Sequence, residues 1–367
     1  MKIVTVCDLN FSQASPRAFR VSELITQLSA RGHQVWLVNA FDRTIYGPDE
    51  ISALSYVKPF DAGINKKTDL ISIMKKVAFF RRCNKVFNYF FYTYKVPFRT
   101  SFIKKAMRSF DEFDVLLSVS SPFYVHMGAL GIRYKFKPIK ILDCGDPLNY
   151  CEFKYAPYWK RIERKIYSKG DFICVPTKKA VALYEKMLPR EKLRVIPQGI
   201  DFSRYPIEEY VPHDRPAFVY AGRFYEKIRN PKAFLDYLLT VKKDFKFDVY
   251  TNKDDAFFSK LKEYEEKLKG RMEIHEFVSR AECIRILSKA DFLINIENAS
   301  LYQQPSKLID YGISKRPVLS FAPDMFMPEI FEEFLQGDYS HGLEIDVSPF
   351  DIKKVTSQFE ELFVKDT

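Results

Sequence analysis

The sequence predicts two doubly wound α/β domains in tandem, and three observations support this prediction. The chain has 367 residues, which exceeds the roughly 250 to 300 residues at which a single hydrophobic core stops growing. Short apolar runs alternate with amphipathic stretches, the pattern of parallel strands connected by helices. Residues 197–212 are rich in Pro, Gly and polar residues and predict a boundary. We expect domains at 1–200 and 201–350, and a C-terminal helix at 351–367.

Apolar runs define the elements of the first half. They predict strands at 2–7, 35–40, 114–120, 139–144, 172–176 and 193–197, with helices between them. The first connection is the most informative. Ser15 and Pro16 are typical of an N-cap and a first helical position, and Gly32 is typical of a helix end. Strand, helix and strand therefore form one βαβ unit.

The second half repeats this alternation. Its apolar runs predict strands within AFVYAGRF, FKFDVYTN, MEIHEF, DFLINIE and PVLSFA. Ser279 with Glu282 forms a capping-box signature at the start of a helix. Ligands of open α/β sheets bind at the carboxyl ends of the strands, so two such sheets in tandem predict a small-molecule site in a cleft between the domains. The architecture does not choose the chemistry.

Charge, apolar runs and cysteine content limit the partners and the cellular location that we expect. No run of about 18 apolar residues occurs, and the start MKIVTVCDLN lacks the pattern of a signal peptide, so we expect a cytoplasmic protein. Six scattered cysteines without a close CxxC pair indicate neither disulfides nor zinc. Residues 1–200 carry a net charge of +17 and residues 201–367 a net charge of −6. This asymmetry predicts an anionic surface as the partner of the first half.

Three segments resemble a known family. LRVIPQGID, YAGRF and PSKLIDYGISKRPVLS occur in the order and spacing of retaining glycosyltransferases of family 4, and the resemblance is most specific between Arg194 and Ser320. That family has the GT-B fold, two Rossmann-like domains facing a central cleft. The resemblance implies transfer of a sugar from a nucleotide sugar, with a UDP-sugar favoured, without a metal or another cofactor. It also implies a role in bacterial envelope or capsule polysaccharide synthesis.

The donor site is expected in the second half. Arg223 follows an apolar strand, with Lys227 and Arg229 on the next loop. The resemblance implies that Arg223 and one of those two neutralise the donor diphosphate, although a solvated basic loop is the alternative. Ser306 and Lys307 fall in the first turn of a predicted helix, where backbone amides can bind phosphate oxygens.

Asp310 lies seven positions before Pro317, and the resemblance implies that it binds the donor ribose hydroxyls. The alternative is an ordinary exposed helix carboxylate. The sequence departs from the family at Tyr302, where a second acidic residue is usual. This departure leaves the identity of the donor sugar open.

The acceptor site is expected in the first half, where Asp143 and Asp146 lie at the carboxyl end of a predicted strand. Asp146 can orient or deprotonate an acceptor hydroxyl, or it can serve as an N-cap or Asx turn beside Pro147. His126 lies on a predicted helix, where it is either catalytic or, more commonly for a lone histidine, packed in the core.

The loop after the first strand lacks the paired glycines that are common in the family at this place. It has Arg17 and Arg20 at one-turn spacing near the start of the next helix, and these two side chains are candidates to contact an acceptor phosphate. A nicotinamide site is excluded, because no GxGxxG follows the first strand.

Residues 71–110 form the most biased segment, with ten Lys and Arg, eleven aromatic residues and no Asp or Glu. It includes Arg81 and Arg82. Such a segment favours peripheral contact with an anionic membrane at the inner face of the cell membrane, because cations attract head groups while aromatic rings bury at their boundary. The alternatives are aromatic core packing and single-stranded nucleic acid. We expect no nucleic acid, because no recognised nucleic-acid module is present.

The sequence therefore predicts a glycosyltransferase that moves a sugar from a nucleotide sugar to a lipid-linked saccharide acceptor. Two alternatives stay open. A nucleotide-sugar epimerase shares the architecture and needs neither an acceptor nor a membrane. A non-catalytic membrane or nucleic-acid binding protein is compatible with the missing acidic residue at Tyr302.

Overall fold

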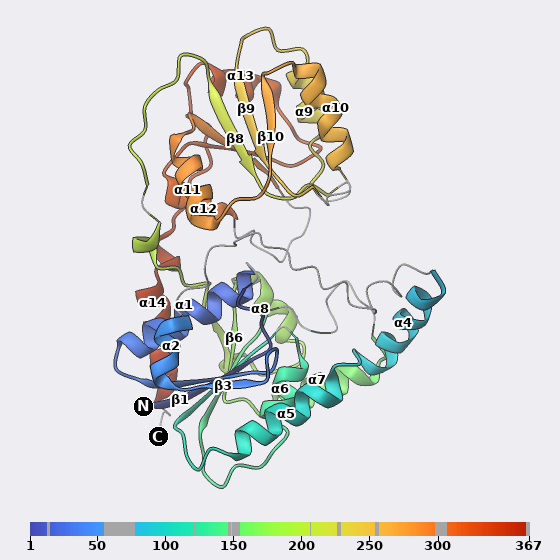
Figure 1. Ribbon diagram of the computed structural model, residues 1–367, viewed down its shortest axis with the longest axis vertical. Coiled ribbons are helices and arrows are strands. Elements are labelled where there is room, and N and C mark those ends of the chain that lie inside the picture. Colours follow the sequence, from blue (N-terminus) through green and yellow to red (C-terminus); the bar gives the residue numbers. More distant parts are fainter. Residues whose placement is uncertain are drawn as a thin grey trace. The chain divides into compact units, whose positions relative to one another are not determined.

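The computed structural model describes residues 1–12, 15–54, 78–120, 122–145, 148, 155–205, 207–225, 229–253, 257–297 and 307–364, and for 52–54 and 78–83 the backbone alone. The chain divides into two compact units (Figure 1). Unit 1 contains Met1–Ile200 and Ile352–Thr367, and unit 2 contains Asp201–Asp351. Each unit has a sheet with helices on both faces, so the predicted α/β class is confirmed.

Unit 1 is built on a seven-stranded sheet of order β3-β2-β1-β4-β5-β6-β7. Its strands are β1 (Lys2–Cys7), β2 (Gln34–Asn39), β3 (Thr44–Tyr46), β4 (Val115–Val119), β5 (Ile139–Asp143), β6 (Phe172–Val175) and β7 (Leu193–Val195). Every neighbouring pair is parallel except β2 and β3. The six predicted strands are confirmed, and β3 is an additional one.

Helices cover both faces of this sheet. The helices of unit 1 are α1 (Pro16–Ala30), α2 (Pro48–Leu54), α4 (Ala78–Phe91), α5 (Val96–Arg108), α6 (Tyr124–Ala129), α7 (Tyr158–Tyr167), α8 (Lys178–Tyr184) and α14 (Ile352–Glu360), with short 3₁₀ turns at Arg190–Lys192 and Glu361–Phe363. Of these, α4 extends away from the sheet (Figure 1). The predicted start of α1 is confirmed, because Ser15 Oγ accepts the Ala18 N–H at 3.1 Å. Gly32 ends this helix with a φ of +87°, a conformation that favours glycine.

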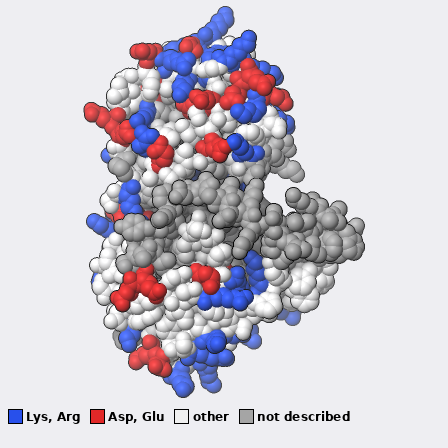
Figure 2. All heavy atoms as spheres, viewed as in Figure 1, with Lys and Arg blue, Asp and Glu red and all other residues white. Residues whose placement is uncertain are grey.

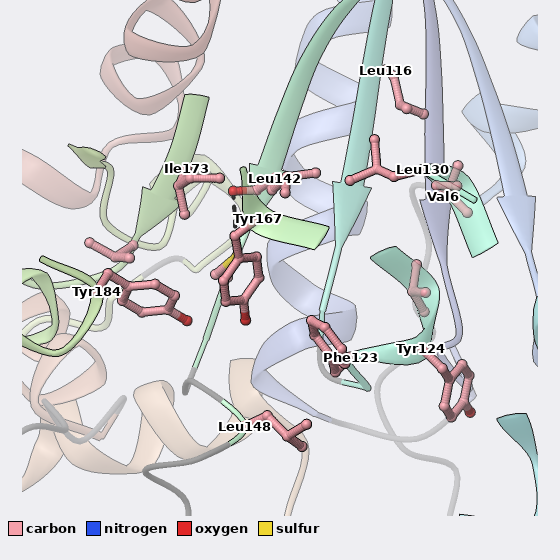
Figure 3. Packing of buried hydrophobic residues seen from close by; sticks show 14 of the residues in the cluster. Val6, Leu116, Phe123, Tyr124, Leu130, Leu142, Leu148, Tyr167, Ile173 and Tyr184 are labelled. Carbon is pink, nitrogen blue, oxygen red and sulfur yellow. Dashed lines mark hydrogen bonds between the residues drawn. The ribbon is translucent and has the colours of Figure 1, made fainter. Parts of the chain in front are cut away.

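The core of unit 1 lies in two layers. Side chains of α5, α6, α7 and α8 pack on one face of the sheet, and side chains of α1, α2 and α14 pack on the other. Figure 3 shows the rings of Tyr167 and Tyr184 beside Leu142 and Ile173 of the sheet. The centroids of the two rings lie 5.5 Å apart, and both side chains are fully buried.

The C-terminal helix α14 belongs to unit 1, although the whole of unit 2 precedes it in the chain. Phe359 is fully buried among residues of β1, β2 and α1. Arg31 pairs with Glu360, and His33 Nε2 lies 3.0 Å from the same carboxylate. Figure 1 shows α14 beside α1. Burial of its apolar face therefore closes one side of unit 1.

Unit 2 is built on a five-stranded parallel sheet of order β10-β9-β8-β11-β12. Its strands are β8 (Ala217–Ala221), β9 (Lys246–Tyr250), β10 (Met272–His275), β11 (Phe292–Ile296) and β12 (Val318–Phe321), each within a predicted segment. Its helices are α9 (Lys232–Leu238), α10 (Phe258–Leu268), α11 (Arg280–Lys289), α12 (Lys307–Ser314) and α13 (Pro328–Leu335), with 3₁₀ turns at Phe202–Arg204 and Ser348–Phe350. The predicted cap of α11 is confirmed, since Ser279 Oγ accepts the Glu282 N–H.

Phenylalanines dominate the core of unit 2. Phe218 of β8 stacks on Phe247 and Phe292, its two sheet neighbours, with ring centroids 4.8 Å apart in both pairs. Side chains of α9, α10 and α13 cover this face, while α11 and α12 cover the other. Figure 2 shows acidic and basic side chains interspersed over unit 2 on the face in view.

Candidate active site

The chain turns sharply where β8 ends. Gly222 has a φ of +151°, and a Cβ atom there would lie 3.7 Å from Lys307 Cδ. Glycine therefore permits this backbone conformation, while the lysine lies at an ordinary contact distance. Arg223 follows with an exposed side chain, and its carbonyl oxygen accepts hydrogen bonds from Tyr220 Oη at 2.9 Å and Arg229 Nη1 at 3.2 Å. Arg229 thus holds the backbone beneath the exposed Arg223.

Two cations meet at the carboxyl ends of β8 and β11. The side chain of Arg229 is buried, and Lys307 Nζ donates to the carbonyl oxygen of Ile296 at 3.3 Å. The ammonium group also lies 4.7 Å from the ring centroid of Tyr220. Burial lowers the pKa of Lys307 well below its ordinary value, and the charge of Arg229 lowers it further. Within the described ranges Lys307 pairs with no carboxylate. A bound anion would relieve this cost.

Asp310 lies one turn beyond Lys307 on α12 and faces α11. Its Oδ1 accepts two hydrogen bonds from Arg280, at 2.7 Å from Nε and at a shorter distance from Nη2. Burial raises the pKa of Asp310 above its ordinary value, although Arg280 acts in the opposite direction. Asp310 is therefore a partly buried, paired carboxylate, unlike an ordinary exposed one.

In unit 1, Asp143 at the end of β5 is fully engaged by arginines. Arg20 donates from Nε to Oδ2 at 2.6 Å and from Nη2 to Oδ1 at 2.8 Å, and Arg17 Nη1 lies 3.5 Å from Oδ2. Burial alone would raise the pKa of Asp143, but Arg20 and Arg17 hold it below its ordinary value. Arg20 also donates to the carbonyl oxygens of Pro197 and Ile196. This geometry favours a structural role for Arg20 and Asp143, while Arg17 stays partly exposed.

His126 on α6 is fully buried. Its Nδ1 lies 2.8 Å from Ser118 Oγ and its Nε2 lies 3.5 Å from Cys144 Sγ. Burial lowers the pKa of His126 to about 3, so the imidazole is neutral near pH 7. This environment favours the packed alternative over the catalytic one.

Several predicted residues lie outside the described part of the chain. These are Asp146, Lys227 and Ser306 in full, and the side chains of Arg81 and Arg82 on α4. Tyr302, where the sequence departs from the family, also lies outside. The roles expected of these residues stay predictions.

The helix α4 and the residues after it expose apolar side chains that form what we call the α4 surface, comprising Val86, Phe87, Phe90, Phe91, Tyr94 and Phe98. Phe98 is 65% exposed and Phe91 is 59% exposed. Tyr92 instead packs inward against Trp159, and the centroids of the two rings lie 5.6 Å apart. The core alternative therefore holds for Tyr92 and not for the α4 surface. Among the described residues, no helix has the length and apolarity needed to cross a bilayer.

One group among the described residues has metal-ligand chemistry. Asp248, Glu273 and His275 lie together on β9 and β10. One side-chain oxygen or nitrogen atom from each lies within 4.8 Å of those of the other two. Lys246 Nζ already lies 3.0 Å from Asp248 Oδ2, and His275 Nε2 lies 2.8 Å from Asp248 Oδ1. These contacts satisfy Asp248 within the protein.

Sequence reasoning missed Arg280. It lies thirty residues before Asp310, just after the capping Ser279, and one arginine among 58 cationic residues carries no local signal. The contact arises only because α11 and α12 pack side by side on one face of the sheet.

Comparisons with known proteins bear on both the fold and the class. Residues 18–204, just over half of the chain, match the family model of Glycosyltransferase Family 4. A comparison with curated proteins found no match.

Solved structures match nearly the whole chain. HepE from Anabaena, solved with UDP, is 10% identical with a TM-score of 0.63 and covers 98% of this chain and 99% of its own. A glycosyltransferase from Rickettsia africae is 13% identical with a TM-score of 0.62, and the match covers 99% of this chain and 97% of its own. The lipopolysaccharide outer core galactosyltransferase WaaB is 12% identical with a TM-score of 0.53, covering 99% of each chain. The fold is therefore GT-B.

Proposed function

Because this chain belongs to Glycosyltransferase Family 4, we propose that it moves a sugar from a UDP-sugar to a lipid-linked saccharide, with retention of configuration, in envelope polysaccharide synthesis. One observation carries the donor part of this proposal. The buried Arg229 and the half-buried Lys307 lie where β8 and β11 end, and the carboxylate of Asp310 lies one turn further along α12. Such a site suits a diphosphate joined to a ribose.

The donor base and the pathway are supported by similar proteins. HepE has been solved with UDP and with UDP-glucose, and WaaB is a galactosyltransferase of the lipopolysaccharide outer core. We therefore favour uridine over other bases and an envelope saccharide as the acceptor.

In the proposed reaction, Arg223, Arg229 and Lys307 bind the diphosphate. The bond between the sugar C1 and the diphosphate oxygen breaks, and the acceptor oxygen bonds to C1 from the same face. The acceptor proton passes to the departing diphosphate. The three cations stabilise the negative charge that develops on this leaving group, a task that a metal performs in other enzymes, so we propose transfer without a metal.

A membrane-bound acceptor fits the surface of unit 1. The α4 surface exposes large apolar side chains, and residues 71–110 contain ten cations and no acidic residue. Aromatic rings at the head-group boundary and cations near anionic lipids would hold the protein at the inner face of the cell membrane.

Calorimetric titration with UDP, GDP and CDP tests the donor site directly. We expect UDP to bind with the highest affinity, and Asp310→Ala to weaken this binding by about tenfold, because the variant loses hydrogen bonds to a charged group. Asp324→Ala removes an exposed carboxylate of unit 2 and is the matched control. If none of the three nucleotides binds the wild-type protein, the proposed donor site is wrong.

A further inference from the structure

The pair between Arg280 and Asp310 uses only one of the two carboxylate oxygens. Both Nε and Nη2 of Arg280 donate to Oδ1. Oδ2 has no hydrogen-bond partner in the described ranges, and it is not among the buried polar atoms left without one. Oδ2 therefore keeps access to solvent. The arginine satisfies half of the carboxylate and leaves the other half open to a ligand.

The guanidinium group of Arg280 is itself held in place. Its Cζ lies 5.3 Å from the ring centroid of Tyr205, a buried residue that directly follows the 3₁₀ turn Phe202–Arg204. Ser279 caps α11 at the preceding position and so fixes the backbone from which the side chain extends. The side chain is only 11% exposed. An arginine fixed on both sides loses little conformational entropy when it orients a partner.

We propose that Arg280 is a positioning residue for the donor nucleoside, which holds Asp310 so that Oδ2 accepts the ribose hydroxyls. This inference rests on the proposed function, since it concerns the same donor site. Two vicinal hydroxyls can both donate to a carboxylate oxygen that has no other partner. Arg280 acts through the carboxylate, because its Nε and Nη2 both donate to Oδ1.

The groups around Asp310 show why its charge depends on Arg280. Cys283, one turn along α11, stays a neutral thiol, because burial and then the charge of Asp310 raise its pKa to about 12. The ring of Tyr205 lies against the guanidinium group of Arg280. Lys307 on the same helix is directed at Ile296. Arg280 is thus the cation in direct contact with Asp310, and it opposes the rise in the pKa of Asp310 that burial causes.

Loss of Arg280 should therefore produce a pH effect with a defined sign. Without the guanidinium the pKa of Asp310 rises further, so the carboxyl group takes up a proton at a higher pH. A protonated carboxyl has one acceptor fewer for the ribose. UDP affinity should then fall more steeply as the pH is lowered than the wild-type affinity does.

The experiment compares UDP, 2′,3′-dideoxy-UDP and pyrophosphate by calorimetry from pH 5.5 to 8, on the wild type, Arg280→Gln, Arg280→Lys and Asp310→Asn. We expect Arg280→Gln to weaken UDP binding by roughly tenfold near pH 6 and less near pH 8. Arg280→Lys should recover part of the loss. Pyrophosphate, which lacks the ribose, should bind the wild type and Arg280→Gln equally. Dideoxy-UDP should bind the wild type weakly, with no further loss in Arg280→Gln.

Each failure has a separate meaning. If the wild type binds UDP but Arg280→Gln shows the same affinity and pH profile, the positioning role is wrong and the donor site stands. If Arg280→Gln also weakens pyrophosphate binding, Arg280 acts on the phosphates and the inference is overturned. If the wild type binds neither UDP nor pyrophosphate, the proposed function and the inference both fall. Thermal unfolding checks that each variant is folded, and Arg280→Lys replaces Arg280→Gln if the latter is not.

Discussion

At the scale of single residues, Asp143 shows how position along the chain can suggest a site while local contacts suggest a structural role. The carboxylate ends β5, where ligands of α/β sheets bind, yet Arg20 engages both of its oxygens. Gly145 makes room for the second arginine, since a Cβ atom there would lie 2.0 Å from Arg17 Nη2. The pair joins β5, α1 and the segment after β7.

We expect Asp143→Asn to destabilise unit 1 by about 3 to 5 kcal/mol, because it leaves the buried Arg20 without a counter-ion. The pKa of Asp143 is lowered in the folded state, so this stabilisation is present above the ordinary carboxyl pKa of about 4 and is lost as the pH falls through the lowered value. Urea unfolding between pH 3 and 7 measures both effects, with the exposed Asp111→Asn as control. A variant with unchanged stability but no sugar transfer would instead support the catalytic role.

At the scale of elements, local signals explain which parts of the fold the sequence could predict. The start of α1 follows from Ser15 and Pro16, and the buried strands follow from uninterrupted apolar runs. The strand β3 has only three residues, none of them buried, and its antiparallel pairing with β2 depends on a turn that carries no apolar pattern. It was missed for that reason.

The α4 surface is the part of unit 1 that we expect to contact a membrane. Phe87 and Phe91 lie one turn apart, with ring centroids 4.9 Å apart, and both are exposed. We expect the double variant Phe87→Ser/Phe91→Ser to reduce binding to vesicles that contain phosphatidylglycerol by at least tenfold, since each buried aromatic side chain contributes about 1.5 to 3 kcal/mol. Co-sedimentation measures this.

The matched control is Phe277→Ser, which removes an exposed aromatic side chain of unit 2. Neutral phosphatidylcholine vesicles should bind the wild type less than anionic ones, because the acid-free segment 71–110 adds electrostatic attraction. Equal binding of the double variant and the wild type to anionic vesicles would contradict a membrane role for the α4 surface.

At the scale of the whole molecule, the order of motifs predicted the fold better than it predicted the contacts of each site. Lys307 and Asp310 come from one helix, so their spacing alone places them a turn apart. The partner of Asp310 comes from α11 and the partner of Asp143 from α1, and both depend on packing between distant segments. Such pairs are set by tertiary structure, which a single sequence does not display.

The return of the chain to unit 1 leads to the last prediction. Phe359 lies 159 residues beyond Ile200 in the sequence, yet its ring is fully buried in unit 1 and lies 5.7 Å from the guanidinium carbon of Arg20. We expect Phe359→Ala to cost unit 1 about 3 to 5 kcal/mol through lost burial and the resulting cavity. Differential scanning calorimetry with and without UDP measures this.

Each unit has its own core, so we expect two unfolding transitions in that experiment. Phe359→Ala should lower the transition of unit 1, whereas UDP, bound through Arg229 and Lys307 of unit 2, should raise the other transition by mass action. Val364→Ala, at an exposed position after α14, is the control. If Phe359→Ala and UDP act on the same transition, the two units unfold together. In that case α14 stabilises the whole molecule, because unit 1 does not unfold without unit 2.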